Sequence, residues 1–408
     1  MYYVGIDWAD QKHDVSLVDD GGRLVNKPFT IRNTNSGYEQ LHAQLERLSE
    51  NPLDFKIGIE TPQHLLVDFL LELGYAVWAI FPGAMKSFRK RYRTSGARDD
   101  VFDAFVLADV LRTDKACWRS VDLGSERLRE IRLLANVHHD AIALHTMLNN
   151  ALRATLKAYY PAALHFFGDV ACANALAFLQ SYPTLEAARR LTREQLAAFF
   201  KEQRLRNGKT VRKIEALLQQ QHVPVATART RVYQRKALCY AKQLATLAPE
   251  LKAYAVRLQE LIEPHPDGAL FLSYPGVSYV TAARLVALFG ENRARYAHAG
   301  ELQGLAGTCP VTEKTGTASR IIYYRRACNK FYRDTMHNLA FSSLTKAAWI
   351  NAYYRKQRAH GKTHSHALRC LANVHVRILF AMWKNRTPYD ENIFLSQKTR
   401  HLLANQKI

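Results

Sequence analysis

The sequence predicts an α/β domain with a mixed sheet at the N-terminus, followed by an all-α remainder. Two observations lead to this prediction: short apolar runs alternate with helical patterns in residues 1–124, and beyond them the apolar residues recur mainly at helical spacing. The chain has 408 residues, more than one ordinary hydrophobic core accommodates. We therefore expect a second domain at residues 125–265, with a helical insertion at 161–225, and a third at residues 266–408.

The N-terminal domain is expected to contain five strands and three helices. Its first and fourth strands are short apolar runs that each end in a carboxylate, and a Gly-Gly turn at residues 20–22 predicts a hairpin. The predicted strands cover residues 2–7, 14–19, 23–31, 55–60 and 75–82, and the predicted helices cover 36–48, 64–74 and 100–114. This order, βββαβαβα, is that of the RNase H-like fold, a hairpin-led mixed sheet with helices on both faces.

The rest of the chain is expected to form long helices and a tight turn. Residues 126–160 and 228–262 carry apolar side chains at helical spacing, and we expect them to pack as an antiparallel or intermolecular coiled coil. The basic segment 201–213 is equally consistent with a solvated helix face and with a binding surface. Residues 275–278 form a Pro-Gly-Val-Ser turn that resembles a helix-hairpin-helix turn, which presents backbone N–H groups to phosphate.

The positive charge is concentrated away from the N-terminal domain. The formal net charge is +21, of which residues 121–265 contribute +9 and residues 266–408 contribute +14, whereas residues 1–120 contribute −2. Such a surface favours nucleic acid as partner, because neutralising phosphates releases counterions; the alternatives are a merely soluble basic protein and one that seeks a membrane surface. The residues expected to contact nucleic acid are Gly276, Ser278, Arg320, Arg325, Arg326, Lys330, Arg355, Lys356, Arg358 and Lys362.

Cysteine usage and hydropathy indicate a cytoplasmic protein. The six cysteines are scattered without a C-x-x-C pair, which fits reduced thiols and gives no zinc signature. No apolar run approaches the length needed to cross a bilayer, and the N-terminus shows no secretory leader. We therefore expect no membrane partner.

Four carboxylates are expected to meet at one edge of the predicted sheet. The first and fourth strands of an RNase H-like sheet are parallel neighbours, so Asp7 and Glu60 would lie side by side. Asp100 and Asp103 share one face of the last helix, which packs across that edge. Because unpaired anions repel one another, this arrangement favours divalent cations, and oxygen ligands without Cys or His favour Mg²⁺ or Mn²⁺.

Such a cluster suits phosphodiester chemistry. Two metal ions about 4 Å apart can activate an attacking oxygen and stabilise the leaving one. Each carboxylate alone also has a structural explanation, as a strand end, a surface residue or a helix cap. Asp99 and Asp109 are the alternatives for the two positions on the helix.

Five segments of the sequence carry a resemblance that covers most of the chain. They read VGIDWADQKHDVSLVD, IGIET, ARDDVFDAFVLAD, LSYPGVSYVTAARLVALFG and RRACNKFYRD. In this order they resemble the DEDD-type insertion-sequence transposases related to Piv DNA invertases, some of which are RNA-guided bridge recombinases. The last helix motif of that family reads Lys-x-Asp-x-x-Asp-Ala, and the matching residues here are Arg98, Asp100, Asp103 and Ala104.

The resemblance implies an N-terminal RuvC-like domain, a coiled-coil dimerisation arm and a C-terminal transposase domain with a serine nucleophile before a glycine. At the matching position this sequence has Thr315, whose hydroxyl could attack phosphorus although its methyl group crowds the site. Thr317 and Ser319 are alternative nucleophiles, and a protein that binds without completing recombination is a third explanation. Arg320, with the two arginines at 325 and 326, would clamp phosphate.

The sequence thus predicts a DNA transposase or site-specific recombinase that cuts and rejoins donor and target DNA. We expect Mg²⁺-dependent chemistry at the four carboxylates and a covalent phosphoprotein intermediate. The resemblance adds a guide or bridge RNA and a homo-oligomer, a dimer or a tetramer, in the bacterial cytosol or nucleoid. Two alternatives stay open: a RuvC-like nuclease or junction resolvase that uses water, and a non-catalytic nucleic-acid scaffold.

Overall fold

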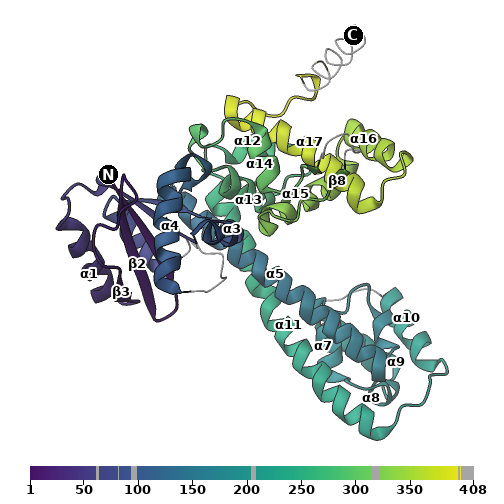
Figure 1. The fold of residues 1–408 in the computed structure, drawn as a ribbon. Coiled ribbons are helices and arrows are strands. Elements are labelled where there is room, and N and C mark those ends of the chain that lie inside the picture. Colours follow the sequence, from purple (N-terminus) through teal and green to yellow (C-terminus); the bar gives the residue numbers. More distant parts are fainter. Residues whose placement is uncertain are drawn as a thin grey trace. The chain divides into compact units, whose positions relative to one another are not determined.

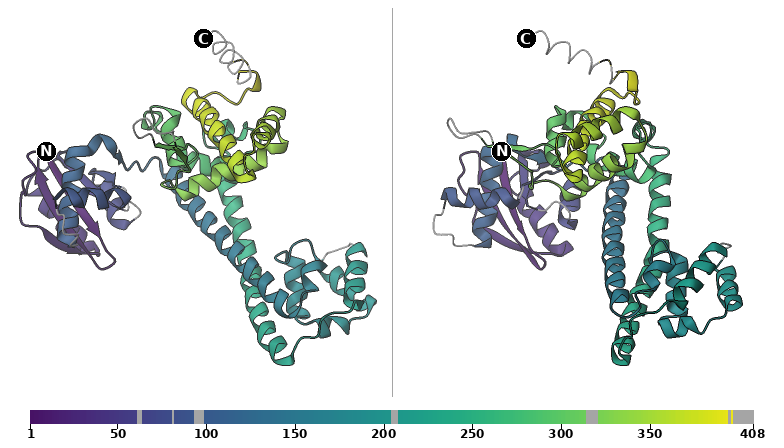
Figure 2. Two further views of the ribbon diagram at one scale, coloured as in Figure 1. Left: turned by 45° about the vertical axis from the view of Figure 1, so that its right-hand side comes forward. Right: turned by 90° about the vertical axis from the view of Figure 1, so that its right-hand side faces the viewer.

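The chain folds into two compact units, Met1–Leu123 and Gly124–Ile408. The computed structural model describes residues 1–60, 64–80, 82–92, 99–203, 208–313, 321–393 and 396. Within these ranges the first unit is a mixed α/β body, and the second is helical apart from one small hairpin (Figures 1 and 2). The prediction of an N-terminal mixed sheet and a helical remainder is therefore confirmed. The separation of 125–265 from 266–408 as two domains stays a prediction.

The first unit is built on a six-stranded mixed sheet with the strand order β3-β2-β1-β4-β5-β6. The central strand β1 pairs antiparallel with β2 and parallel with β4, and the parallel pairing is the one that the sequence predicted. The strands are β1 (Tyr2–Trp8), β2 (Lys12–Asp19), β3 (Phe29–Arg32), β4 (Phe55–Ile59), β5 (Ala76–Ala79) and β6 (Arg119–Ser120). Strand β3 begins later than predicted, directly after Pro28, which has no N–H group to donate to a ladder.

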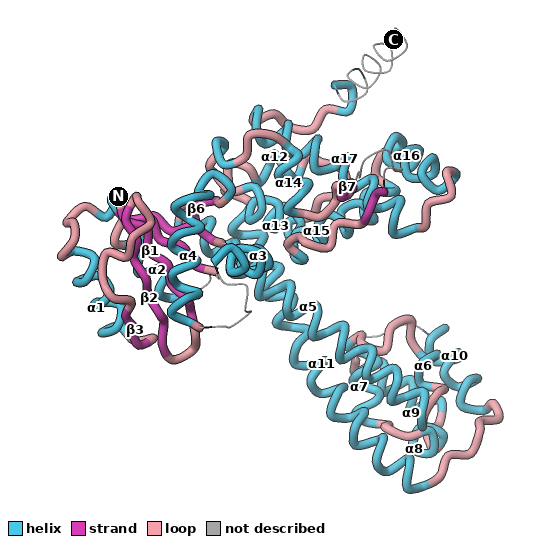
Figure 3. Tube along the Cα trace, viewed as in Figure 1, coloured by secondary structure: helices cyan, strands magenta, loops and turns pink. Residues whose placement is uncertain are grey.

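Helices cover both faces of this sheet (Figure 3). Helices α1 (Asn35–Glu46) and α2 (Leu65–Glu72) pack on one face, and α3 (Pro82–Tyr92) and α4 (Asp100–Asp114) pack on the other. Helix α4 has the predicted bounds. Neither α3 nor β6 was predicted, because α3 is rich in Lys and Arg and β6 has only two residues.

Two long helices dominate the second unit, and they lie side by side in Figures 1 and 2. They are α5 (Glu126–Tyr159) and α11 (Thr227–Ile262), close to the predicted bounds, and α11 continues through Pro249. Five shorter helices pack on their far ends around one hydrophobic core. These are α6 (Ala163–Phe166), α7 (Ala173–Ser181), α8 (Leu185–Arg189), α9 (Arg193–Glu202) and α10 (Gly208–Gln219).

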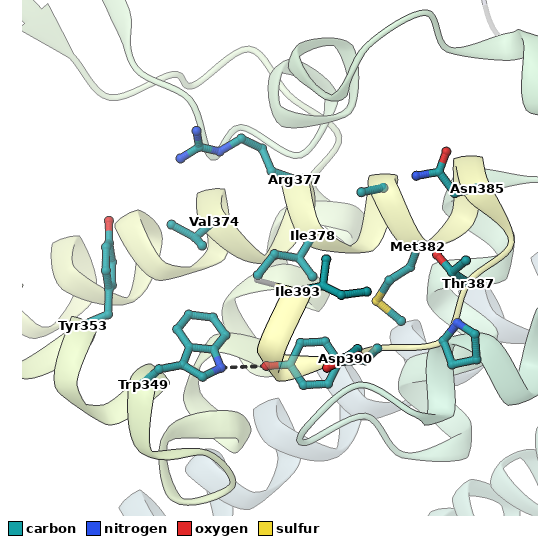
Figure 4. Close-up of a pocket in the computed structure, with 13 residues that line it drawn as sticks. Trp349, Tyr353, Val374, Arg377, Ile378, Met382, Asn385, Thr387, Asp390 and Ile393 are labelled. Atoms are coloured by element: carbon teal, nitrogen blue, oxygen red, sulfur yellow. Dashed lines mark hydrogen bonds between the residues drawn. The ribbon is translucent and has the colours of Figure 1, made fainter. Parts of the chain in front are cut away.

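The other ends of α5 and α11 pack with the C-terminal helices around a second core. These helices are α12 (Gly268–Leu272), α13 (Tyr279–Phe289), α14 (Ala299–Leu305), α15 (Lys330–Ser342), α16 (Ala348–Ala359) and α17 (His364–Asn385). The hairpin of β7 (Val311–Glu313) and β8 (Ile321–Tyr323) follows α14 in the chain. Helices α16 and α17 border an apolar pocket of about 440 Å³, where Trp349 Nε1 donates to the Tyr389 hydroxyl at 2.7 Å (Figure 4).

A fully buried histidine connects three elements of this core. His375 of α17 hydrogen-bonds to the Tyr274 hydroxyl through Nδ1, and its Nε2 lies 3.3 Å from Ser343 Oγ. The Ser343 hydroxyl donates to the Ala340 carbonyl oxygen, so it accepts from Nε2–H and leaves Nδ1 to accept from Tyr274. The neutral tautomer thus satisfies every partner, and burial lowers the pKa of His375 to about 3.

We expect acid to destabilise the second unit through His375. Its pKa is lower in the folded state than the value of 6.5 expected in the unfolded chain, so this stability is present above pH 6.5 and is lost as the pH falls toward 3. Between pH 7 and pH 5 the loss is about 2 kcal/mol from this residue. Urea unfolding at both pH values would measure it. A His375→Gln variant should lose less on acidification than the wild type; an equal loss would contradict the assignment.

Candidate active site

The candidate site lies at the end of the two central parallel strands. Ile6 of β1 pairs with Ile59 of β4, and Asp7 and Glu60 are the next residues along each strand. The two carboxylate residues therefore stand next to each other at one edge of the sheet. Because side chains alternate along a strand, both lie on the face opposite Ile6 and Ile59, which is the face that α4 covers.

Two glycines bring α4 onto this face. Gly5 and Gly58 pair across β1 and β4, two residues before Asp7 and Glu60. A Cβ atom on Gly5 would lie 1.9 Å from the Ala104 carbonyl oxygen of α4, so no side chain fits between this strand and this helix. The first turn of α4, with its carboxylates, is thereby held beside the strand ends.

We expect Gly5→Ala to destabilise the first unit by about 3 kcal/mol, because its methyl group would push against the α4 backbone. Urea unfolding followed by tryptophan fluorescence would measure the change. Gly21→Ala is the matched control, since its Cβ would meet only the Asp19 side chain at 3.2 Å in an exposed turn. An unchanged midpoint for Gly5→Ala would show that α4 does not approach the strand so closely.

The four predicted carboxylates influence one another electrostatically. The pKa of Asp7 is raised to about 7, chiefly by burial and then by the charges of Asp103, Glu60 and Asp100, while Arg89 opposes them. Burial also raises the pKa of Glu60, against the effect of Arg89. The negative charge of each carboxylate thus makes it harder for its neighbours to lose their protons. Their assignment as metal ligands stays a prediction.

Arg89 of α3 lies among these carboxylates, and the sequence reasoning missed it. Its Nε is 2.5 Å from Asp103 Oδ1, its Nη2 is 2.7 Å from Asp103 Oδ2, and the same Nη2 is 3.8 Å from Glu60 Oε1. The signal in the sequence was the basic run that immediately precedes the Asp-rich stretch. Among the described residues, no three His, Cys, Asp or Glu side chains are arranged to hold a metal ion.

The two alternative aspartates have structural roles. Asp99 is the N-cap of α4, and its side chain accepts a hydrogen bond from the Val101 N–H group at 3.3 Å. Asp109 is buried, hydrogen-bonds to the Tyr92 hydroxyl and forms an ion pair with Arg112 at 2.7 Å. Asp100 and Asp103 are among the charges that raise the pKa of Asp7, whereas Asp99 and Asp109 are not, which favours Asp100 and Asp103 for the site.

The donor chemistry fits a divalent cation. The side chains whose charges raise the pKa of Asp7 are all carboxylates, which are the ligands that hard cations prefer, and these charges add to the effect of burial. Arg89 supplies one compensating charge, so a metal ion and Arg89 would compete for Asp103. A bound cation would polarise a phosphodiester oxygen and favour ionisation of an attacking hydroxyl.

This competition gives a testable expectation for Arg89→Met. Without metal, the variant should lose about 1–3 kcal/mol of stability, less than for a fully buried pair because the Arg89 side chain is 25% exposed. With Mg²⁺, its melting temperature should rise more than that of the wild type. Lys90→Met, on an exposed position of the same helix, controls for the loss of charge. An identical Mg²⁺ response in all three proteins would contradict the competition.

The second unit holds the remaining predicted site residues. Gly276 has φ +86°, and a Cβ there would lie 2.9 Å from Ser343 Cα, so the turn requires glycine. Ser278 is the N-cap of α13 and accepts from the Thr281 N–H group at 3.3 Å. The candidate cations Arg326, Lys330, Arg355, Lys356 and Arg358 are exposed, and Arg325 and Lys362 are partly buried.

Several predicted residues lie outside the described part of the chain. These are Arg98, Thr315, Thr317, Ser319 and Arg320. Thr315 stands in the segment between β7 and β8, whose paired ends are Glu313 and Ile321. Its role as nucleophile rests on the sequence alone.

Comparison with known proteins places the chain in a class of mobile-element proteins. A family model of IS110-type DEDD proteins, described as a transposase, matches residues 4–161. A second model, described as the transposase IS116/IS110/IS902 family, matches residues 268–355. These two matches cover the α/β unit and the C-terminal helices around α13 and α15.

Curated relatives agree over nearly the whole length. The mini-circle putative transposase for IS117 of Streptomyces coelicolor is 31% identical over 95% of both chains. An IS116 protein of Streptomyces clavuligerus is 28% identical over 94% of this chain and 95% of its own, and an IS900 protein of Mycobacterium paratuberculosis is 24% identical over 95% and 96%. The chain belongs to the IS110 family of transposases, so it acts in DNA transposition and recombination.

Family membership bears on the expected metal, and the helices of the structure bear on the expected absence of a membrane partner. A DEDD transposase family suggests the use of a divalent metal, in keeping with the acidic site. In the described part of the chain, each helix is either too short or too polar to cross a membrane.

Proposed function

We propose that this transposase cuts and rejoins DNA with Mg²⁺ or Mn²⁺ at Asp7, Glu60, Asp100 and Asp103 and with a hydroxyl nucleophile at Thr315. The observation that supports the metal half is that the charges of Asp103, Glu60 and Asp100 all act on the half-buried Asp7 and, with burial, raise its pKa. The nucleophile half rests on the family motif. In this proposal the first unit is a RuvC-like domain.

The roles of the residues follow from their surroundings. Asp7 lies in β1 and Glu60 directly follows β4, so the paired strands fix their backbones, which suits groups that position a cation relative to a phosphate. Asp103 is buried and paired with Arg89, so its carboxylate is oriented before a metal binds. Asp100 is exposed in the first turn of α4 and is positioned to complete the ligand set from the solvent side. Attack by the Thr315 hydroxyl would join the phosphate to the protein and release a DNA 3′ or 5′ hydroxyl.

Partners and assembly complete the proposal. The exposed arginines and lysines of α16 would bind donor and target DNA and a guide or bridge RNA. Helices α5 and α11 would form a coiled-coil arm through which a dimer or tetramer assembles. Exposed apolar side chains on α5, among them Leu133, Val137 and Met147, support such an interface.

The test is a reaction with the wild-type protein. The chain would be expressed beside its native flanking DNA, and the co-purified nucleic acid would be sequenced to identify the substrates. We expect strand exchange that requires Mg²⁺ or Mn²⁺ and a DNA end covalently attached to a peptide containing Thr315, detected by mass spectrometry. Metal-dependent cleavage without any adduct would instead support the nuclease alternative, in which water attacks. Binding without cleavage under all metal conditions would support the scaffold.

A further inference from the structure

A basic pocket of about 820 Å³ lies in the second unit, apart from every residue assigned so far. It is lined by α5, α13, α15, α17 and the residue that follows β8. Three arginines reach it, Arg284, Arg333 and Arg369, against a single carboxylate, Asp334. Asp334 is already engaged by Arg333, whose Nε lies 3.1 Å from Asp334 Oδ1. The pocket therefore has an excess of positive charge.

Arg284 is the unusual member of this group. It is only 6% exposed, and its Nε and Nη2 atoms are buried without a hydrogen-bond partner. Its guanidinium packs 5.4 Å from the centre of the Phe331 ring, and burial lowers its pKa while the charge of Asp334 opposes this shift. Buried N–H groups without an acceptor are costly, so these two atoms point to a missing partner, and the oxygen atoms of a bound anion would supply it.

Arg369 also has a nitrogen atom without a hydrogen-bond partner, and it packs against a different aromatic ring. Its Nε is buried without a hydrogen-bond partner, and its guanidinium lies 3.8 Å from the centre of the Tyr324 ring. Arg333 Nη1 donates to the hydroxyl of the same tyrosine at 3.4 Å. Tyr324 is exposed, so an aromatic ring backed by an arginine stands at the mouth of the pocket. Such a ring suits stacking against a base.

We infer that this pocket binds a backbone phosphate of a single-stranded nucleic-acid segment, through Arg284 and Arg369, while Tyr324 stacks on a neighbouring base. The combination of a buried arginine, a partly buried arginine and an exposed aromatic ring favours a single strand over a duplex, whose bases are already stacked. The inference rests on the proposed function only in taking nucleic acid as the source of the phosphate. Tyr324 directly follows β8, so the pocket borders the hairpin that carries Thr315 in the sequence.

Full-length protein in EDTA would be titrated with a fluorescein-labelled single-stranded DNA oligonucleotide and with its duplex, at several NaCl concentrations. Because no metal is present, the result does not depend on catalysis, so a failure of the proposed chemistry leaves this test intact. The variants are Arg284→Met and Arg369→Gln. Arg377→Gln is the matched control, because Arg377 is an exposed arginine of α17 that lines a different pocket (Figure 4).

Each pocket variant should weaken single-strand binding roughly tenfold and reduce the salt dependence by about one phosphate contact. The control should change both values much less. Arg284→Met should also keep or raise the melting temperature, because it removes an unpaired buried cation. The melting temperature thus shows whether weaker binding by Arg284→Met results from a loss of folding.

Three outcomes would overturn the inference. The first is unchanged affinity and salt dependence in both pocket variants. The second is an equal loss for duplex and single strand, which would indicate a general charge effect. The third is a rise in melting temperature with inorganic phosphate that Arg284→Met abolishes while oligonucleotide binding is unaltered, which would make the pocket a site for free phosphate.

Discussion

Asp7→Asn should reduce DNA strand exchange by roughly 10³-fold or more, with little effect on folding. The substitution keeps the shape of the side chain and removes one negative charge at the point where the other three carboxylates act on it. Loss of a metal ligand removes several kcal/mol of transition-state stabilisation, and about 4 kcal/mol corresponds to a factor of roughly 10³. A strand-exchange assay with varied Mg²⁺ would measure both the rate and the metal requirement.

Asp7→Asn should lower the strand-exchange rate without lowering the stability of the fold. Asp7 is destabilised by burial and by its neighbours, so Asn at this position should keep or raise the melting temperature in the absence of metal. In contrast, Mg²⁺ should stabilise the variant less than the wild type. Asp99→Asn is the matched control, because asparagine also serves as an N-cap and Asp99 lies beside the site without belonging to it. Equal activity of wild type and Asp7→Asn would refute the metal assignment.

The placement of Asp7 and Glu60 could be predicted because it depends on short-range rules. An apolar run that ends in a carboxylate occurs twice, as does the glycine two residues earlier, and parallel pairing puts the two copies at the same level. The bounds of α4 were predictable for a similar reason, since Asp99 provides a cap and buried residues then recur through the helix. The local motifs need no knowledge of distant contacts, whereas the pairing of β1 with β4 followed from the strand order of the RNase H-like fold.

Arg89 and Arg284 could not be assigned in this way. Helix α3 is so rich in Lys and Arg that no apolar period marks it, and the partner of Arg89 comes from a different helix. Arg284 stands within an Ala- and Leu-rich helix, a position where an aliphatic side chain would be expected. Its significance appears only when α5, α15 and α17 surround it and leave its Nε and Nη2 atoms without a hydrogen-bond partner. An arginine inside an apolar helical run was the one signal in the sequence.

Thr315→Val should abolish the protein–DNA adduct and reduce strand exchange by roughly 10³-fold or more. Valine has nearly the shape of threonine but no hydroxyl, so the attacking oxygen is lost while packing is kept. Thr315→Ser retains the hydroxyl without the methyl group and should remain active, within about tenfold of the wild type. The readouts are mass spectrometry of the adduct and the strand-exchange rate, which should fall together if one oxygen serves both.

Variants of the neighbouring hydroxyl residues test whether Thr315 is the nucleophile. Thr317→Val and Ser319→Ala remove the alternative nucleophiles one at a time, and both should still form the adduct at Thr315. An adduct that persists in Thr315→Val and disappears in one of these two variants would move the nucleophile to that residue. Asp7→Asn should lower the rate without changing which residue is modified. In the double variant Asp7→Asn with Thr315→Ser, any DNA adduct should therefore lie on the introduced serine. An adduct at another residue would show that the metal site and the hydroxyl at position 315 do not act in the same reaction.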